Sequence, residues 1–133
     1  MTIAANGSTA TNIDAGGSMN SSGEVKAVDP ETGGSKGRKP AEFALIPPDV
    51  LWEIAELFGI GVAKYGNVNG RPNYQAGYPW SWSFSAMQRH LWQYWSGEDL
   101  DSESGKHHLT HAAWHCMALL WFTLHEAGVD DRP

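Results

Sequence analysis

Apolar residues recur at helical spacing in three segments after residue 49. These segments predict three helices, over residues 50–65, 84–96 and about 106–126. Asp49 suits the N-cap or first turn of the first helix, and Ser83 is the expected N-cap of the second. Gly97 is expected to end the second helix as the glycine that follows its last turn. Gly59 and Gly61 are expected to weaken or kink the first helix.

The rest of the chain lacks the alternation of apolar and polar positions that predicts strands. We therefore expect an all-α fold, a small helical bundle of about three main helices. Residues 1–30 contain no aromatic residue and are rich in Gly, Ser, Asn, Thr and Ala, a composition typical of a disordered tail. The expected organisation is a disordered tail over residues 1–30, an all-α domain over 31–128 and a C-terminal tail over 129–133.

Length and charge narrow the class of protein. A chain of 133 residues forms at most one domain of ordinary size. Its net charge of −6 argues against a protein that coats duplex nucleic acid. No apolar run reaches the roughly 18 residues of a membrane span, so no membrane partner is expected. The 7 Trp residues are many for so small a core, and we expect some of them at the interface of a homodimer or higher homo-oligomer.

A glycine-rich basic segment, residues 31–40, stands out in this acidic chain. Lys36 and Arg38 could hold an anion such as a phosphate, because glycines let backbone N–H groups approach a ligand closely. The segment is not a Walker A loop, because it lacks the GxxxxGK[ST] pattern after a strand. The alternative is a flexible linker with solvated charges.

Two groups of carboxylates are candidates for metal binding. The loop over residues 97–105 places four of them within six positions, at Glu98, Asp99, Asp101 and Glu103. Hard divalent cations prefer such oxygen ligands, although an acidic turn can also be only solvated surface. Glu53 and Glu56 lie one turn apart on the first helix, where they could share a metal or form a solvated face.

Histidines and aromatic residues supply the remaining candidates. His108, His111 and His115 fall on one face of the third helix, where they could be metal ligands, phosphate contacts or satisfied core residues. The spacing is not an HExxH motif, because no Glu follows His111. Tyr74 and Trp80 lie in an expected loop over residues 66–82 and could either stack on a nucleobase or tuck under the domain.

Several short motifs keep a shared order along residues 31–126. They are Thr32-Gly33-Gly34-x-Lys36, Lys39-Pro40, Leu45-Ile46-Pro47, Ala63-Lys64-Tyr65-Gly66, Arg89-His90-Leu91, Gly97-Glu98-Asp99-x-Asp101, Ser104-Gly105 and His108-Leu109-x-His111-Ala112-Ala113. This pattern resembles the phage-encoded N-terminal domain of dATP/dGTP diphosphohydrolases, a family similar to the MazG-like all-α NTP pyrophosphohydrolases. The chain departs from the pattern at Asn73-Tyr74, which follows an apparent insertion, and at Glu53-x-x-Glu56, which lacks the doubled first Glu of the MazG-like motif.

The resemblance implies a metal-dependent hydrolase that is encoded by a phage and located in the cytoplasm of the host cell. The implied reaction converts a purine deoxynucleoside triphosphate, dATP or dGTP, to the monophosphate and pyrophosphate with Mg²⁺ or Mn²⁺, which would alter the nucleotide pool. The implied site comprises metal ligands Glu98, Asp99, Asp101, Glu53 and Glu56, ligand or general-base residues His108 and His111, and substrate-binding residues Lys36, Arg38, Lys64, Arg89, His90, Tyr74 and Trp80. The alternatives are a protein that binds and sequesters a nucleotide without cleaving it, and a structural or interaction module.

Overall fold

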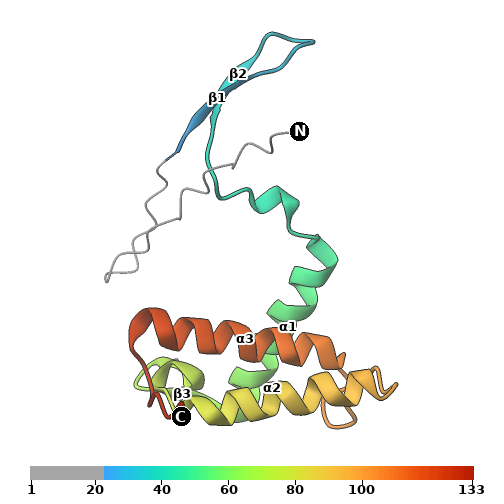
Figure 1. The fold of residues 1–133 in the computed structure, drawn as a ribbon, viewed down its shortest axis with the longest axis vertical. Helices are drawn as coiled ribbons and strands as arrows, with labels where there is room; N and C mark the ends of the chain where they lie inside the picture. The colour runs from blue at the N-terminus through green and yellow to red at the C-terminus, as the bar shows by residue number, and fades with distance from the viewer. Residues whose placement is uncertain (1–22) are drawn as a thin grey trace. The chain divides into compact units, whose positions relative to one another are not determined.

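The computed structural model describes residues 23–133 and divides the chain at Leu45 into an N-terminal unit and a C-terminal unit, Ile46–Pro133. Figure 1 shows the elements of both units. Of the disordered tail expected over residues 1–30, residues 1–22 lie outside the described residues, and residues 25–28 form a strand instead. Within residues 23–133, no helix combines the length and the apolar character that crossing a membrane requires.

The N-terminal unit contains an antiparallel hairpin that the sequence analysis did not predict. Strand β1 (Val25–Val28) pairs with β2 (Ser35–Arg38), and a short 3-10 helix, η1 (Phe43–Leu45), follows. In the connecting turn, the Asp29 carboxylate accepts hydrogen bonds from the backbone N–H groups of Glu31 and Thr32. The all-α expectation is therefore wrong in this segment, and the protein is mostly helical with small sheets.

The C-terminal unit contains the three predicted helices. They are α1 (Pro48–Tyr65), α2 (Trp80–Trp95) and α3 (His108–His125). Helices α2 and α3 lie side by side and antiparallel (Figure 1), and α1 also packs on α3. Between α1 and α2 lie the two-residue strands β3 (Asn67–Val68) and β4 (Arg71–Pro72) and the 3-10 helix η2 (Asn73–Ala76).

The helix ends follow local chemistry. Helix α1 begins with Pro48, whose fixed φ suits the first turn, and it carries Asp49 in that turn and Lys64 in the last one, as the helix dipole favours. It continues through Gly59 and Gly61. Helix α2 ends as predicted, with Gly97 at φ 100° after the C-cap.

Helix α2 begins four residues earlier than the predicted residue 84. The alternation of Trp80, Ser81, Trp82 and Ser83 hides the helical period, so the sequence analysis placed this turn in a loop and made Ser83 the cap. The start is instead stabilised from the distant C-terminus, because Asp131 accepts a hydrogen bond from the Ser81 backbone N–H at 2.9 Å. Residues 129–131, expected to form a tail, thus pack on α2.

The core of this unit is small and partly polar. Its buried apolar residues are Leu57, Ala112, Ala118 and Phe122, most of them on α3, which is the central helix as predicted. The buried polar residues are Ser83, His108 and Thr110. Many large apolar side chains remain exposed, among them Trp95 with 79% of its surface accessible. Self-association stays a prediction.

Candidate functional site

A polar cavity of about 400 Å³ lies between the three helices and the loop that joins α2 to α3. Charged and titratable groups from all four segments line it. They are Lys64 of α1, Arg89 and His90 of α2, Asp101, Glu103 and Ser104 of the loop, and His111 and His115 of α3. Five residues assigned to the site from sequence therefore meet at this cavity, namely Lys64, Arg89, His90, Asp101 and His111.

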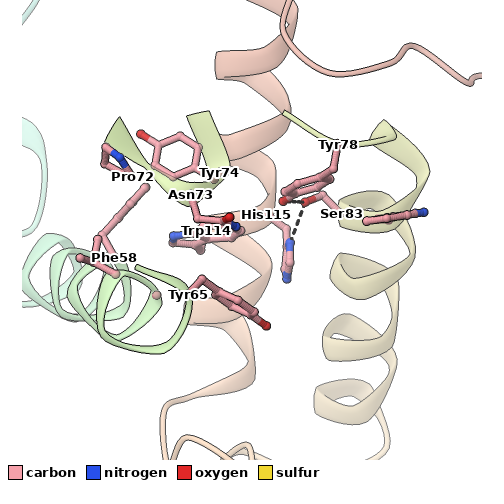
Figure 2. Close-up of a pocket in the computed structure, with 12 residues that line it drawn as sticks. Phe58, Tyr65, Pro72, Asn73, Tyr74, Tyr78, Ser83, Trp114 and His115 are labelled. Atoms are coloured by element: carbon pink, nitrogen blue, oxygen red, sulfur yellow. Dashed lines mark hydrogen bonds between the residues drawn. The ribbon is translucent and has the colours of Figure 1, made fainter. Parts of the chain in front are cut away.

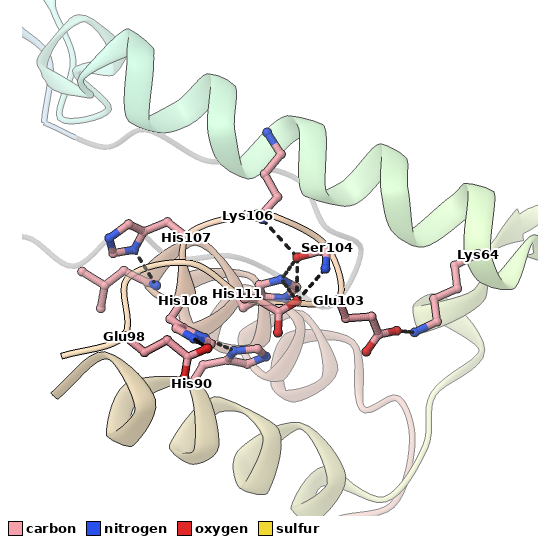
Figure 3. A network of polar contacts seen from close by, with 11 residues as sticks. Lys64, His90, Glu98, Glu103, Ser104, Lys106, His107, His108 and His111 are labelled. Carbon is pink, nitrogen blue, oxygen red and sulfur yellow. Dashed lines mark hydrogen bonds and ion pairs between the residues drawn. The ribbon is translucent and has the colours of Figure 1, made fainter. Parts of the chain in front are cut away.

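Four histidines, His90, His108, His111 and His115, form a histidine cluster between α2 and α3. The rings of His90 and His111 are stacked, with centroids 4.3 Å apart and planes inclined by 7°. Nδ1 of His90 lies 2.8 Å from Nδ1 of His108, so this contact needs a proton on one of the two nitrogens or a cation between them. The shared face of α3 predicted from sequence exists, and His90 meets it from α2 (Figure 3).

The acidic loop is fixed to this cluster through Asp101. Its carboxylate accepts hydrogen bonds from the backbone N–H of Ser104 at 2.9 Å and from the Ser104 hydroxyl at 2.7 Å. The same hydroxyl oxygen lies 2.6 Å from Nε2 of His111 (Figure 3). Because the hydroxyl proton goes to Asp101, His111 donates from Nε2, and its Nδ1 carries the lone pair. The loop thereby sets the tautomer of a cavity histidine.

Burial keeps the cavity histidines neutral at pH 7. Burial, and then the neighbouring imidazoles, lower the pKa of His90 and of His115 to about 4, and burial also lowers the pKa of His111. Burial acts to raise the pKa of Asp101, but the hydrogen bonds from Ser104 and the nearby His111 outweigh it, so this pKa lies below its ordinary value. The cavity therefore offers neutral imidazoles beside an ionised carboxylate.

Three of these residues come close enough to hold one metal ion. A ring nitrogen from each of His90 and His108 and a carboxylate oxygen of Asp101 lie within 4.8 Å of one another. Glu98 is next to them, with Oε1 3.3 Å from Nε2 of His108. That Nε2 is fully buried and, among residues 23–133, forms no hydrogen bond of acceptable geometry. The donor types fit a divalent cation, and the unsatisfied Nε2 faces a carboxylate that can accept its proton.

Two of the other carboxylates predicted as metal ligands, those of Glu53 and Glu56, form ion pairs with a lysine. Glu53 and Glu56 both pair with the ammonium group of Lys106, which lies 3.2 Å from Oε2 of Glu53. Asp99 contributes its backbone carbonyl, which accepts a hydrogen bond from the N–H of His108 at 2.9 Å. These contacts attach the loop to α1 and α3.

The predicted phosphate-binding residues fall into two groups. Lys64 and Arg89 line the polar cavity, where Lys64 pairs with Glu103 and its pKa is raised mainly by that hydrogen bond. Lys36 and Arg38 lie on β2 of the N-terminal unit, where Arg38 pairs with Glu42.

An aromatic cavity of about 360 Å³ adjoins the polar one (Figure 2). Its walls include Phe58, Tyr74 and Trp114, which pack against one another with ring centroids 5.7–5.8 Å apart. Tyr78 and the exposed Trp82 lie nearly parallel at the side formed by α2. The two cavities share four lining residues, Gly61, Tyr65, Trp114 and His115. The two cavities are therefore contiguous.

Of the two rings predicted to stack on a base, only Tyr74 lines this cavity. Trp80 donates a hydrogen bond from Nε1 to the carbonyl of Ala127 at 2.8 Å, and the Arg132 guanidinium lies over its ring. Trp80 therefore anchors the C-terminal segment. Trp82, two residues further on, belongs to the cavity wall, and no sequence pattern distinguishes the two residues.

The fold and the site define a mostly helical domain with a cavity lined by charged groups and histidines beside an aromatic one. The model of the family described as "dATP/dGTP diphosphohydrolase, N-terminal" matches residues 30–132, and the chain belongs to this family, which confirms the resemblance. The chain is 35% identical over 92 residues to a protein of Salmonella phage PMBT28 named dATP/dGTP diphosphohydrolase. That match covers 69% of this chain and 30% of the phage protein, so the chain spans less than a third of its relative. No solved structure matches the chain.

Proposed function

We propose that this domain binds a purine deoxynucleoside triphosphate, dATP or dGTP, and hydrolyses it to the monophosphate and pyrophosphate. The observation that carries the proposal is the pair of adjoining cavities in a chain of this family, one polar and one aromatic, with four shared lining residues. A nucleoside triphosphate has the same division into a charged and an aromatic part.

The phosphates are assigned to the polar cavity. Lys64 and Arg89 supply positive charge there, and Arg89 can bind phosphate oxygens in a bidentate manner. We assign the divalent cation, Mg²⁺ or Mn²⁺ in the sequence-based expectation, to the residues around Asp101. A bound divalent ion neutralises phosphate charge and makes a water molecule more acidic.

His111 is the proposed general base. Its neutral ring lines the polar cavity, and the Asp101–Ser104 pair fixes its orientation. Nδ1 of His111 takes a proton from water as the water oxygen bonds to the α-phosphorus. The bond from that phosphorus to the bridging oxygen breaks, and the electron pair leaves with pyrophosphate. Ionised Asp101 stabilises the imidazolium through Ser104.

The base is assigned to the aromatic cavity. Trp82 and Tyr74 offer rings, and ring stacking on a base contributes about 1–3 kcal/mol. Asn73, also in the wall, carries an amide that can both donate to and accept from a purine edge (Figure 2).

An anion-exchange assay of nucleotide products tests the proposal. The protein is incubated with dATP, dGTP and the four ribonucleotides, with Mg²⁺, with Mn²⁺ and with EDTA. We expect metal-dependent monophosphate and pyrophosphate from dATP or dGTP. Asp101→Asn should lower kcat by at least about 10²-fold with an unchanged circular dichroism spectrum, as loss of a key electrostatic group does.

Asp49→Asn is the matched control, because Asp49 is an exposed carboxylate in the first turn of α1 and contacts only its neighbour's backbone. It should retain wild-type kcat. Nucleotides that bind but stay intact under every condition would overturn hydrolysis in favour of a sequestering protein, and an absence of nucleotide binding would overturn both.

A further inference from the structure

We propose that His90, His108 and Asp101 form a site that selects a transition-metal ion such as Mn²⁺, Co²⁺ or Zn²⁺ over Mg²⁺, with Glu98 as the positioning partner of His108. The inference deepens the proposed function by defining the ion and its ligands. It adds His90, which was assigned to substrate from sequence, and it keeps only Asp101 of the five carboxylates expected as ligands, beside two imidazoles.

The donor set carries the choice of ion. Two imidazole nitrogens and one carboxylate oxygen lie within 4.8 Å of one another, on three different segments of the chain. Mg²⁺ demands oxygen ligands and keeps much of its water, whereas imidazole suits ions such as Zn²⁺, and the affinity of a site with nitrogen ligands rises from Mn²⁺ to Co²⁺. Two nitrogens in a set of three therefore disfavour Mg²⁺.

The contact between the two imidazoles points to an ion as well. Nδ1 of His90 and Nδ1 of His108 face each other at 2.8 Å, a contact that either a shared proton or an ion held by both lone pairs accounts for. His108 has no exposed surface, and rigid burial holds its ring in this orientation. An ion bound by both Nδ1 atoms satisfies each of them.

Glu98 then has a specific role. If Nδ1 of His108 binds the ion, Nε2 carries the proton, and the Glu98 carboxylate 3.3 Å away is the group that can accept it. Metal-bound histidines usually donate their second N–H to a carboxylate or carbonyl, which fixes the tautomer. This accounts for the otherwise unsatisfied buried Nε2.

Cobalt titration of the full chain, without nucleotide, tests the site. Aqueous Co²⁺ absorbs only weakly in the visible, and nitrogen ligands shift and strengthen its bands, so these new bands report the ligands independently of hydrolysis. We expect saturation at one Co²⁺ per chain, displacement by Zn²⁺, and persistence of the bands in a large excess of Mg²⁺. His90→Ala should abolish the bands, and Glu98→Gln should weaken Co²⁺ binding about 10–100-fold.

His125→Ala is the matched control, because His125 is an exposed histidine at the end of α3 that stacks on Trp121. It should leave the titration unchanged. A folded protein without bands, wild-type bands in His90→Ala, or ready displacement by Mg²⁺ would overturn the site. If the bands appear as expected but nucleotides stay intact, the metal site stands and the proposed hydrolysis fails.

Discussion

Two glycines of α1, Gly59 and Gly61, allow helix stability to be separated from access to the site. Both lie inside the helix, and a Cβ atom built on either meets no other atom within 4 Å. Only Gly61 lines the cavities, and it lines both of them. Replacing either glycine by Ala or Leu should therefore have similar effects on the helix but different effects on the site.

The expected magnitudes follow from this geometry. A glycine inside a helix costs about 0.5–1 kcal/mol relative to Ala, and Leu has nearly the same helix propensity as Ala. Gly59→Ala and Gly61→Ala should each raise the melting temperature by roughly 2–8 °C, since 1 kcal/mol corresponds to about 4–8 °C in a domain of this size. Leu at position 61 adds four carbons to the shared wall. If overpacking a bound nucleotide costs about 1–3 kcal/mol, as in a protein core, kcat/KM falls roughly 5–150-fold.

Calorimetry and steady-state kinetics on the four variants provide the assay. Gly59→Leu should keep the wild-type kcat/KM. Gly61→Leu should remain folded and show the lowered kcat/KM. Equal kcat/KM in the two Leu variants would refute the assignment of the shared wall to the substrate site. A lower melting temperature for Gly61→Ala would refute the reasoning about the helix.

Three further predictions concern stability and assembly. Ser83→Ala should lower the free energy of unfolding by about 1–3 kcal/mol, because the buried Ser83 hydroxyl contacts the Tyr78 hydroxyl at 2.5 Å and the His115 ring at 3.0 Å. Chemical denaturation measures this loss, and the control Ser85→Ala, at an exposed serine, should stay within about 0.5 kcal/mol of wild type. The melting temperature should fall as pH decreases from about 6.5 to about 4, because His90 and His115 have a lowered pKa of about 4 and the unfolded chain therefore binds more protons in this window; a constant melting temperature across it would contradict the burial argument. We also propose a homodimer or higher oligomer that covers exposed apolar side chains such as Trp95, and light scattering that finds a monomer at every concentration would exclude it.

The helices could be predicted from sequence because their apolar residues recur at the helical period. Helix α3 has its apolar positions and three of its histidines on faces that helical spacing alone defines. The β1–β2 hairpin was missed because strands of four residues are too short for an alternating pattern to be distinguished from a polar segment. The start of α2 was missed because Asp131, 50 residues away, supplies its cap.

The site could be predicted only in part, because it depends on contacts between segments that are distant in the chain. The sequence identified the residue types and the acidic loop, and Asp101 with Ser104 three positions later is a local turn signal. The register of α2 against α3 is a tertiary property, and it brings His90 to His108. The pairing of Glu53 and Glu56 with Lys106 depends equally on how the loop folds back on α1.

Phosphorus NMR of dATP and dGTP after incubation with the wild-type protein and Mn²⁺, recorded once a chelating resin has removed the paramagnetic Mn²⁺, tests the central claim most directly. This measurement identifies the bond that breaks, because pyrophosphate, orthophosphate and triphosphate have separate resonances. The account predicts that the nucleotide triphosphate signals disappear and that monophosphate and pyrophosphate grow in equal amounts. Unchanged signals of the nucleoside triphosphates would contradict it. Release of orthophosphate or of inorganic triphosphate in place of pyrophosphate would also contradict it.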